Sequence, residues 1–138
     1  MGLHRWMGAV GCAILLASCA AATPGSGVTV ASLLHTEWVG EPTPGAGQPV
    51  SISVGADARV NGFSGCNSYF GQVQQAGSAI HFGQLGMTRM LCWREDQNQL
   101  ENQFIKALSS TEGAKMEKDQ LVLLDAQGQA LWRLRKKN

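Results

Sequence analysis

Short alternating segments separated by glycine-rich turns run through most of this chain, and only one long segment has the period of a helix. Residues 50–54 alternate apolar and polar side chains, as a half-buried strand does, and Gly55-Ala56-Asp57 supplies a turn into a second strand at 58–63. The same reasoning predicts further strands at 34–39, 69–74, 79–82, 115–118, 121–125 and 129–135. Hairpins therefore dominate the predicted fold.

The one substantial helix is predicted between Arg94 and Leu108. Its apolar residues fall on one helical face, whereas Glu101, Asn102 and Lys106 point away from that face. Strands, then one helix, then strands, without regular alternation, are typical of an α+β domain. We therefore expect a small, mostly antiparallel β-sheet or open barrel with one packed α-helix.

The first residues carry the pattern of an export signal. Arg5 precedes an apolar run at 10–17, which is far shorter than the roughly 20 residues needed to span a bilayer. The run ends in Leu16-Ala17-Ser18-Cys19, which resembles the bacterial lipobox. That resemblance implies a signal peptide at 1–18, a lipid on the thiol of Cys19 and acylation of the new amino terminus. Cleavage of an ordinary signal after Ala20 or Ala22 is the alternative.

Residues 19–32 are expected to form a flexible tether, because the segment from Ala20 to Gly27 is rich in small residues. The remainder, 33–138, has the size of one domain. Without Arg5, the eleven Lys and Arg residues become ten, which balance ten Asp and Glu residues. Such a neutral chain is not expected to bind nucleic acid. The basic tail at 133–137 is expected to be a solvated chain end, with weak contact to anionic lipid headgroups as the alternative.

Two of the four cysteines remain for folding, since Cys12 leaves with the signal and Cys19 takes the lipid. In an exported chain, Cys66 and Cys92 then predict one disulfide, with a reduced or redox-switchable pair as the alternative. The disulfide would close a loop of about 27 residues and contribute about 3.5 kcal/mol on the chain-entropy model.

Two chemical alternatives involve the same cysteines. Cys66 could be a nucleophile with His35 or His81 as its base, and Cys66, His81 and Cys92 could ligate zinc. Neither set has a recognisable spacing. We therefore expect no catalytic residue, no metal and no cofactor.

Three further features have both a structural and a binding interpretation. Thr88 is expected to hydrogen-bond its own loop and Arg89 to pair with a carboxylate, although the two could instead bind an anion or a partner. Trp38, Trp93 and Trp132 are expected in the core or at its rim, with a shared ligand groove as the alternative. The glycine-rich stretch 61–71 matches no phosphate-binding loop.

Several of these motifs together resemble the META domain, and in particular HslJ-like heat-shock lipoproteins. They are Gly62, Gly65-Cys66-Asn67, Tyr69, Gly71, Phe82-Gly83, Met87-Thr88-Arg89-Met90-Leu91-Cys92, Glu101, residues 104–108, Leu121, Leu123, Asp125 and Gly128. The resemblance covers about residues 33–135. It implies a compact, mostly antiparallel β domain with one packed helix, exported, often lipid-anchored and linked to envelope stress. It carries no established catalytic residues.

The function expected from the sequence is a non-enzymatic, lipid-anchored role in the bacterial envelope, in which the domain binds or stabilises another envelope component under stress. Ala20 follows Cys19 where an aspartate commonly signals inner-membrane retention, so we expect the outer membrane, facing the periplasm. A periplasmic carrier that holds a small apolar or lipid-like ligand between sheet and helix is the alternative. Thiol catalysis at Cys66 is a third hypothesis.

Overall fold

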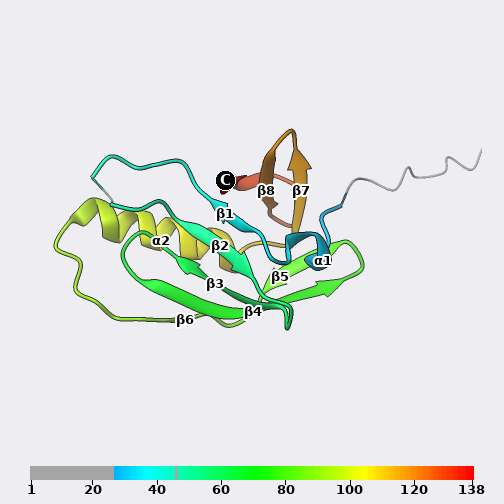
Figure 1. Ribbon diagram of the computed structural model, residues 1–138, viewed down its shortest axis with the longest axis horizontal. Helices are drawn as coiled ribbons and strands as arrows, with labels where there is room; N and C mark the ends of the chain where they lie inside the picture. The colour runs from blue at the N-terminus through cyan, green and yellow to red at the C-terminus, as the bar shows by residue number, and fades with distance from the viewer. Residues whose placement is uncertain (1–26, 46) are drawn as a thin grey trace, which may run out of the picture.

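A computed structural model describes residues 27–45 and 47–138. The described chain forms a mostly antiparallel sheet that curls into a nearly closed barrel, with one long helix packed against it (Figure 1). This confirms the expected fold class. The predicted lipobox, the signal peptide at 1–18 and residues 19–26 of the expected tether lie outside the described residues. The elements are α1 (Val30–Leu33), β1 (Glu37–Val39), β2 (Ser51–Val54), β3 (Arg59–Phe63), β4 (Ser68–Ala76), β5 (Ala79–Phe82), β6 (Gly86–Met87), α2 (Glu95–Ser109), β7 (Gly113–Glu117), β8 (Gln120–Leu124) and β9 (Ala130–Lys136).

The strands follow the order β5-β4-β3-β2-β1-β9-β8-β7, and β6 pairs separately with β4. The two end strands approach each other at a seam. There the Ile80 amide donates to the Glu112 carbonyl at 3.3 Å, and His81 Nδ1 lies 3.2 Å from Glu112 Oε2. These contacts draw β5 toward β7 and bring the barrel close to closure.

The folded part of the described chain begins before Leu33, the residue at which the sequence placed the domain boundary. Gly27 forms a β-bridge with Lys115, and the Val28 amide donates to the Ala114 carbonyl at 3.3 Å. Val28 is only 3% exposed. The last part of the expected tether is therefore packed against β7.

Two short elements were not expected, α1 and β6. Thr29 and Ser32 form a reciprocal capping box that starts α1, and the helix ends at Leu33. Because α1 occupies these residues, the first strand is limited to Glu37–Val39 rather than running over the predicted 34–39. The other predicted strands and the helix are present, with ends shifted by up to two residues.

The core lies between the curled sheet and α2. Phe104 and Leu108 of α2 are fully buried, and the Phe104 ring packs edge-on against Tyr69 at 6.0 Å and Trp132 at 5.1 Å between ring centroids. Side chains thus fill the space between the helix and the sheet. No helix of the described chain is long and apolar enough to cross a membrane.

Candidate functional site

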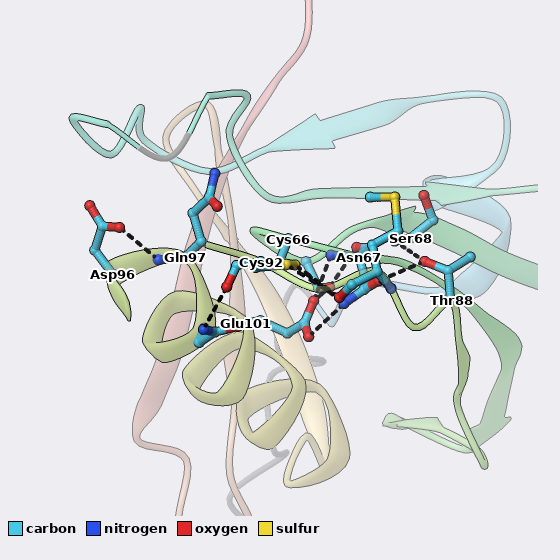
Figure 2. The surroundings of a disulfide bond; sticks show 11 residues. Cys66, Asn67, Ser68, Thr88, Cys92, Asp96, Gln97 and Glu101 are labelled. Atoms are coloured by element: carbon cyan, nitrogen blue, oxygen red, sulfur yellow. Dashed lines mark hydrogen bonds between the residues drawn. A yellow bond between two sulfur atoms is a disulfide. The ribbon is translucent and has the colours of Figure 1, made fainter. Parts of the chain in front are cut away.

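A disulfide joins two loops at one end of the molecule. Cys66 lies in the turn between β3 and β4, and Cys92 lies in the loop that leads from β6 into α2. Their Cα atoms are 6.1 Å apart, within the usual range for a disulfide. We call residues 88–94 the 88–94 loop. Figure 2 shows that polar side chains from both loops and from α2 gather around this bond.

Glycine allows the first of these loops to press against α2. Gly65 has a φ of 118°, which side-chain-bearing residues rarely adopt, and a Cβ there would lie 2.9 Å from Leu100 Cγ. The backbone of the turn therefore approaches the helix closely. This approach brings Asn67 within hydrogen-bonding distance of Glu101.

Glu101 of α2 anchors that turn. Its Oε2 accepts from the backbone N–H of Asn67 at 2.6 Å, and its Oε1 accepts from Asn67 Nδ2 at 3.1 Å. Ser64 Oγ also lies 2.7 Å from Oε2 (Figure 2 shows Glu101 and Asn67). Hydrogen bonds to a charged carboxylate are shorter and stronger than neutral ones, so Glu101 fixes the turn to the helix.

Asn67 transmits this anchoring to the 88–94 loop. Its Oδ1 accepts from Thr88 Oγ1 at 2.9 Å and from the Met90 amide at 2.7 Å, while Nδ2 also donates to Cys66 Sγ at 3.3 Å. Asn67 is only 5% exposed. Every polar atom of this buried side chain thus has a partner, as buried polar groups require.

Three further hydrogen bonds hold the 88–94 loop at Thr88 and Cys92. Thr88 Oγ1 accepts from the Ser68 amide at 3.1 Å, and the Thr88 amide donates to the Ser68 carbonyl at 3.0 Å. Asn98 Nδ2 of α2 donates to the Cys92 carbonyl at 3.3 Å. Ser64, Asn67, Thr88, Asn98 and Glu101 are called here the bracing network.

The bracing network holds the inner side of the loop and leaves its outer side chains in solvent. Met90 is 63% exposed, Leu91 78% and Trp93 91%. A groove of about 740 Å³ lies beside them, and its walls include Phe70, Met90, Leu91, Arg89 and Glu101. A rigid loop that displays apolar side chains beside an open groove is suited to binding.

The structure agrees with the expected positions of some predicted site residues and differs for others. Thr88 makes the expected loop hydrogen bonds, whereas Arg89 is exposed and forms no ion pair within the described residues. Trp38 is buried and Trp132 half-buried, as expected, but Trp93 projects into solvent. The expectation for Trp93 was wrong because the disulfide and the start of α2 turn this segment away from the core.

Most of the basic tail lies within strand β9, and two of its basic residues have close acidic partners. Arg133 pairs with Glu117, and Lys137 Nζ lies 2.8 Å from Glu37 Oε2. All of these side chains remain at least partly exposed, so the ion pairs contribute little to stability. The expectation of a solvated chain end was wrong for the backbone, which pairs with β8 and β1 as far as Lys136, whereas the basic side chains are exposed as expected.

Neither histidine named as a possible base contacts Cys66. His81 pairs with Glu112 at the barrel seam, and His35 is exposed after α1. The side-chain neighbours of the Cys66 sulfur include Cys92 and Asn67 Nδ2. Within the described residues, no three side chains of His, Cys, Asp or Glu converge on a point that could hold a metal ion.

Sequence reasoning missed the central role of Glu101. The helical period placed its side chain away from the core face, and the resemblance included it without assigning a role. The available signal was a carboxylate on the helix that follows a Gly-Cys-Asn turn and a second cysteine. Its partner amides could be identified only once the turn was folded against α2.

Comparisons with known proteins agree with this fold. A family model described as the META domain matches residues 31–138. A protein from Burkholderia xenovorans whose structure was solved by NMR is 25% identical, with a TM-score of 0.65, and the match covers 86% of this chain and 94% of that one. A second NMR structure is 29% identical, with a TM-score of 0.55, and covers 80% of this chain and 94% of that one. No curated protein matches this chain.

Proposed function

The chain belongs to the META domain family, and from that premise we propose that it is a lipid-anchored, non-enzymatic protein of the bacterial envelope that binds an envelope component through the 88–94 loop. Lipid on Cys19 would hold it at the outer membrane, facing the periplasm. The binding would serve the envelope under stress. The observation that carries the proposal is the bracing network, which fixes a loop whose outer side chains are exposed.

A binding role is favoured over catalysis by the chemistry of the site. Cys66 is buried and joined to Cys92, so its sulfur is not available as a nucleophile in the oxidised protein. Glu101 is occupied by the amides of Asn67. No observation supports the alternative of a carrier with a ligand between helix and sheet, because Phe104, Tyr69 and their neighbours fill that space.

The anchor is tested by mass spectrometry of the mature amino terminus. A diacylated or triacylated Cys19 is expected. An unmodified terminus after Ala20 or Ala22 would contradict the anchored part of the proposal and leave the binding part to its own test.

The binding part is tested by photo-crosslinking in the native envelope. A photoreactive residue at Leu91 is expected to give a defined adduct, because this side chain is 78% exposed on the braced loop. The same residue at Gln127, in the exposed turn before β9, is the matched control. Adducts of equal amount from both positions, or none from Leu91, would contradict the proposal.

A further inference from the structure

The outer face of strands β3 and β4 carries a groove of about 690 Å³ that contains no residue of the 88–94 loop. On these strands Val60 is fully buried and Tyr69 and Val73 nearly so, and they point to the core. The residues that alternate with them are exposed and line the groove, together with one glutamine of the loop between β5 and β6: Arg59, Asn61, Phe70, Gln72, Gln74 and Gln84. We call these six residues the amide groove. Its volume is typical of sites for small ligands.

Strand pairing holds the side chains of the amide groove next to one another. Arg59 lies opposite Gln72 in the antiparallel register, and Asn61 lies opposite Phe70 (Figure 1 shows β3 beside β4). The Gly83 amide donates to the Gln72 carbonyl at 2.8 Å, which keeps the loop after β5 beside β4. The groove is therefore built on hydrogen-bonded strands.

Phe70 presents an aromatic surface between this groove and the groove beside the 88–94 loop. Its side chain is 60% exposed. Its ring lies close over Gly86, its partner on β6, because a Cβ at position 86 would overlap the ring. An aromatic ring packed over a cross-strand glycine is restricted in orientation. The exposed part of the ring is thus positioned before anything binds.

The four side-chain amides of the groove are available to a ligand. They belong to Asn61, Gln72, Gln74 and Gln84, all of which are exposed. None of these side-chain amides has a hydrogen-bond partner within the part of the chain that the structure describes. Each amide offers two donors and one acceptor oxygen, so the set suits hydroxyl groups, which both donate and accept.

The amide groove carries little net charge. Arg59 is the one charged residue among those that line it, and its Nε lies 3.0 Å from Asp57 Oδ2. Arg89 and Glu101 line the groove on the other side of Phe70 instead. An uncharged ligand therefore suits the amide groove better than an anion or a cation.

A peptide that binds as an added strand does not suit this groove. Strand β3 pairs with β2 and β4, and β4 pairs with β3 on one side and with β5 and β6 on the other. The strands beneath the groove thus have a paired neighbour on each side. Strand addition needs an unpaired edge, whose main-chain groups supply the affinity.

We propose that the amide groove binds a neutral saccharide chain. A pyranose ring with equatorial hydroxyls has an apolar face of C–H groups, and this face stacks on the exposed ring of Phe70. The sugar hydroxyls form hydrogen bonds with the amides of Asn61, Gln72 and Gln74. This inference goes beyond the proposed function, because the site lies outside the 88–94 loop.

The test uses the full-length protein, processed in its own cell, isotope-labelled for NMR and purified in detergent micelles. The probes are two uncharged oligosaccharides, cellotetraose and tetra-N-acetylchitotetraose, which differ in their acetamido groups. We expect saturable shifts of the side-chain amide signals of Gln72 and Gln74, with a Kd of about 0.1–1 mM because binding must order flexible side chains. No saturable shift with either probe would overturn the proposal.

Variants at Phe70 and Gly86 test the stacking surface. Phe70→Ala is expected to weaken binding about tenfold, whereas Phe70→Tyr keeps a ring and should bind as the wild type does. Gly86→Ala is expected to weaken binding by a similar factor, because the new Cβ displaces the ring of Phe70. Equal affinity of Phe70→Ala and the wild type would overturn stacking on Phe70.

A pair of glutamine variants tests the amides. Gln72→Ala is expected to weaken binding about fivefold, because it removes hydrogen bonds to the sugar. Gln127→Ala, in the exposed turn before β9, is the matched control and should leave the affinity unchanged. Equal effects of the two variants would overturn the role of the groove amides.

Two further outcomes would contradict the inference without touching the proposed function. Tighter binding of an uncharged peptide, acetylated and amidated tetraserine, than of either oligosaccharide would overturn a saccharide as the ligand. Saccharide-induced shifts confined to the 88–94 loop would overturn the assignment to the amide groove. Photo-crosslinking at Leu91 reports the binding role of the loop independently of both.

Discussion

The backbone N–H of Asn67 donates to Oε2 of Glu101 at 2.6 Å, and the side-chain Nδ2 of the same asparagine donates to Oε1 at 3.1 Å. One carboxylate on α2 thereby fixes both the main chain and the side chain of a residue 34 positions earlier. The side-chain oxygen of Asn67, Oδ1, accepts from the Met90 amide. The position of the helix thus determines the position of the 88–94 loop.

Glu101→Gln is expected to lower the free energy of unfolding by about 2–3 kcal/mol, because an NH₂ group would replace an oxygen that accepts from a buried donor. The urea midpoint should fall with an unchanged slope. Glu95→Gln is the control, since Glu95 is exposed and its loss should change stability by less than about 0.5 kcal/mol. Equal losses in the two variants would contradict the anchoring role of Glu101.

Replacing both cysteines, as Cys66→Ala with Cys92→Ala, is expected to lower the free energy of unfolding by about 3.5 kcal/mol. The bond closes a loop between residues 26 positions apart, so its removal enlarges the unfolded ensemble. Denaturation of the wild type with and without reductant gives the matched comparison. A wild type whose stability does not respond to reductant would contradict the disulfide.

Gly62→Ala is expected to destabilise the protein by about 3 kcal/mol or more. A Cβ at this position would lie 2.7 Å from the carbonyl carbon of Ser51 and 2.9 Å from Tyr69 Cε1, so strands β2 and β3 would have to separate. Gly113→Ala in β7 is the control, because its Cβ would meet nothing within 4 Å. Thermal unfolding of both variants checks the difference, and similar melting temperatures would count against the close approach at Gly62.

Alkaline pH is expected to destabilise the fold through Tyr69. Burial raises the pKa of this hydroxyl far above its usual value, and the hydroxyl donates to the Ser51 carbonyl at 2.8 Å. The unfolded chain releases the phenol proton above about pH 10 while the folded chain keeps it. Stability from this group is therefore complete below pH 10 and falls as pH rises beyond it.

Absorbance of tyrosinate measures this directly, because Tyr69 is the one tyrosine of the chain. Ionisation should appear together with unfolding rather than near the ordinary pKa. In Tyr69→Phe the decline in stability above pH 10 should become smaller. Reversible ionisation near pH 10 in the folded protein would contradict the burial of this hydroxyl.

The hairpins and α2 could be predicted from sequence because their signals are local. Alternation in Ser51–Val54 and the helical period of Glu95–Ser109 each reflect one buried face. The short elements α1 and β6 could not be predicted. An element of four residues (α1) or two residues (β6) is too short to show a hydrophobic period. Strand β6 forms because Met87 and Gly86 pair with Tyr69 and Phe70 of β4, which are distant in sequence.

The candidate site was predictable only in part. The cysteine pair followed from counting and from an exported chain, and the loop role of Thr88 followed from its residue type. The exposure of Trp93 could not be predicted from the sequence, because an aromatic residue next to apolar residues is expected to lie in the core. It depends on the path from Cys92 into α2, which is set by the disulfide and by Asn98.

Hydrogen exchange at the Met90 amide tests most directly whether the 88–94 loop is held from its inner side. This amide donates to Asn67 Oδ1 at 2.7 Å, although its own side chain is 63% exposed. We expect slow exchange in the wild type, fast exchange in Asn67→Ala, and unchanged slow exchange in β8, whose Val122 is fully buried. Fast exchange of the Met90 amide in the folded wild type would contradict the braced loop.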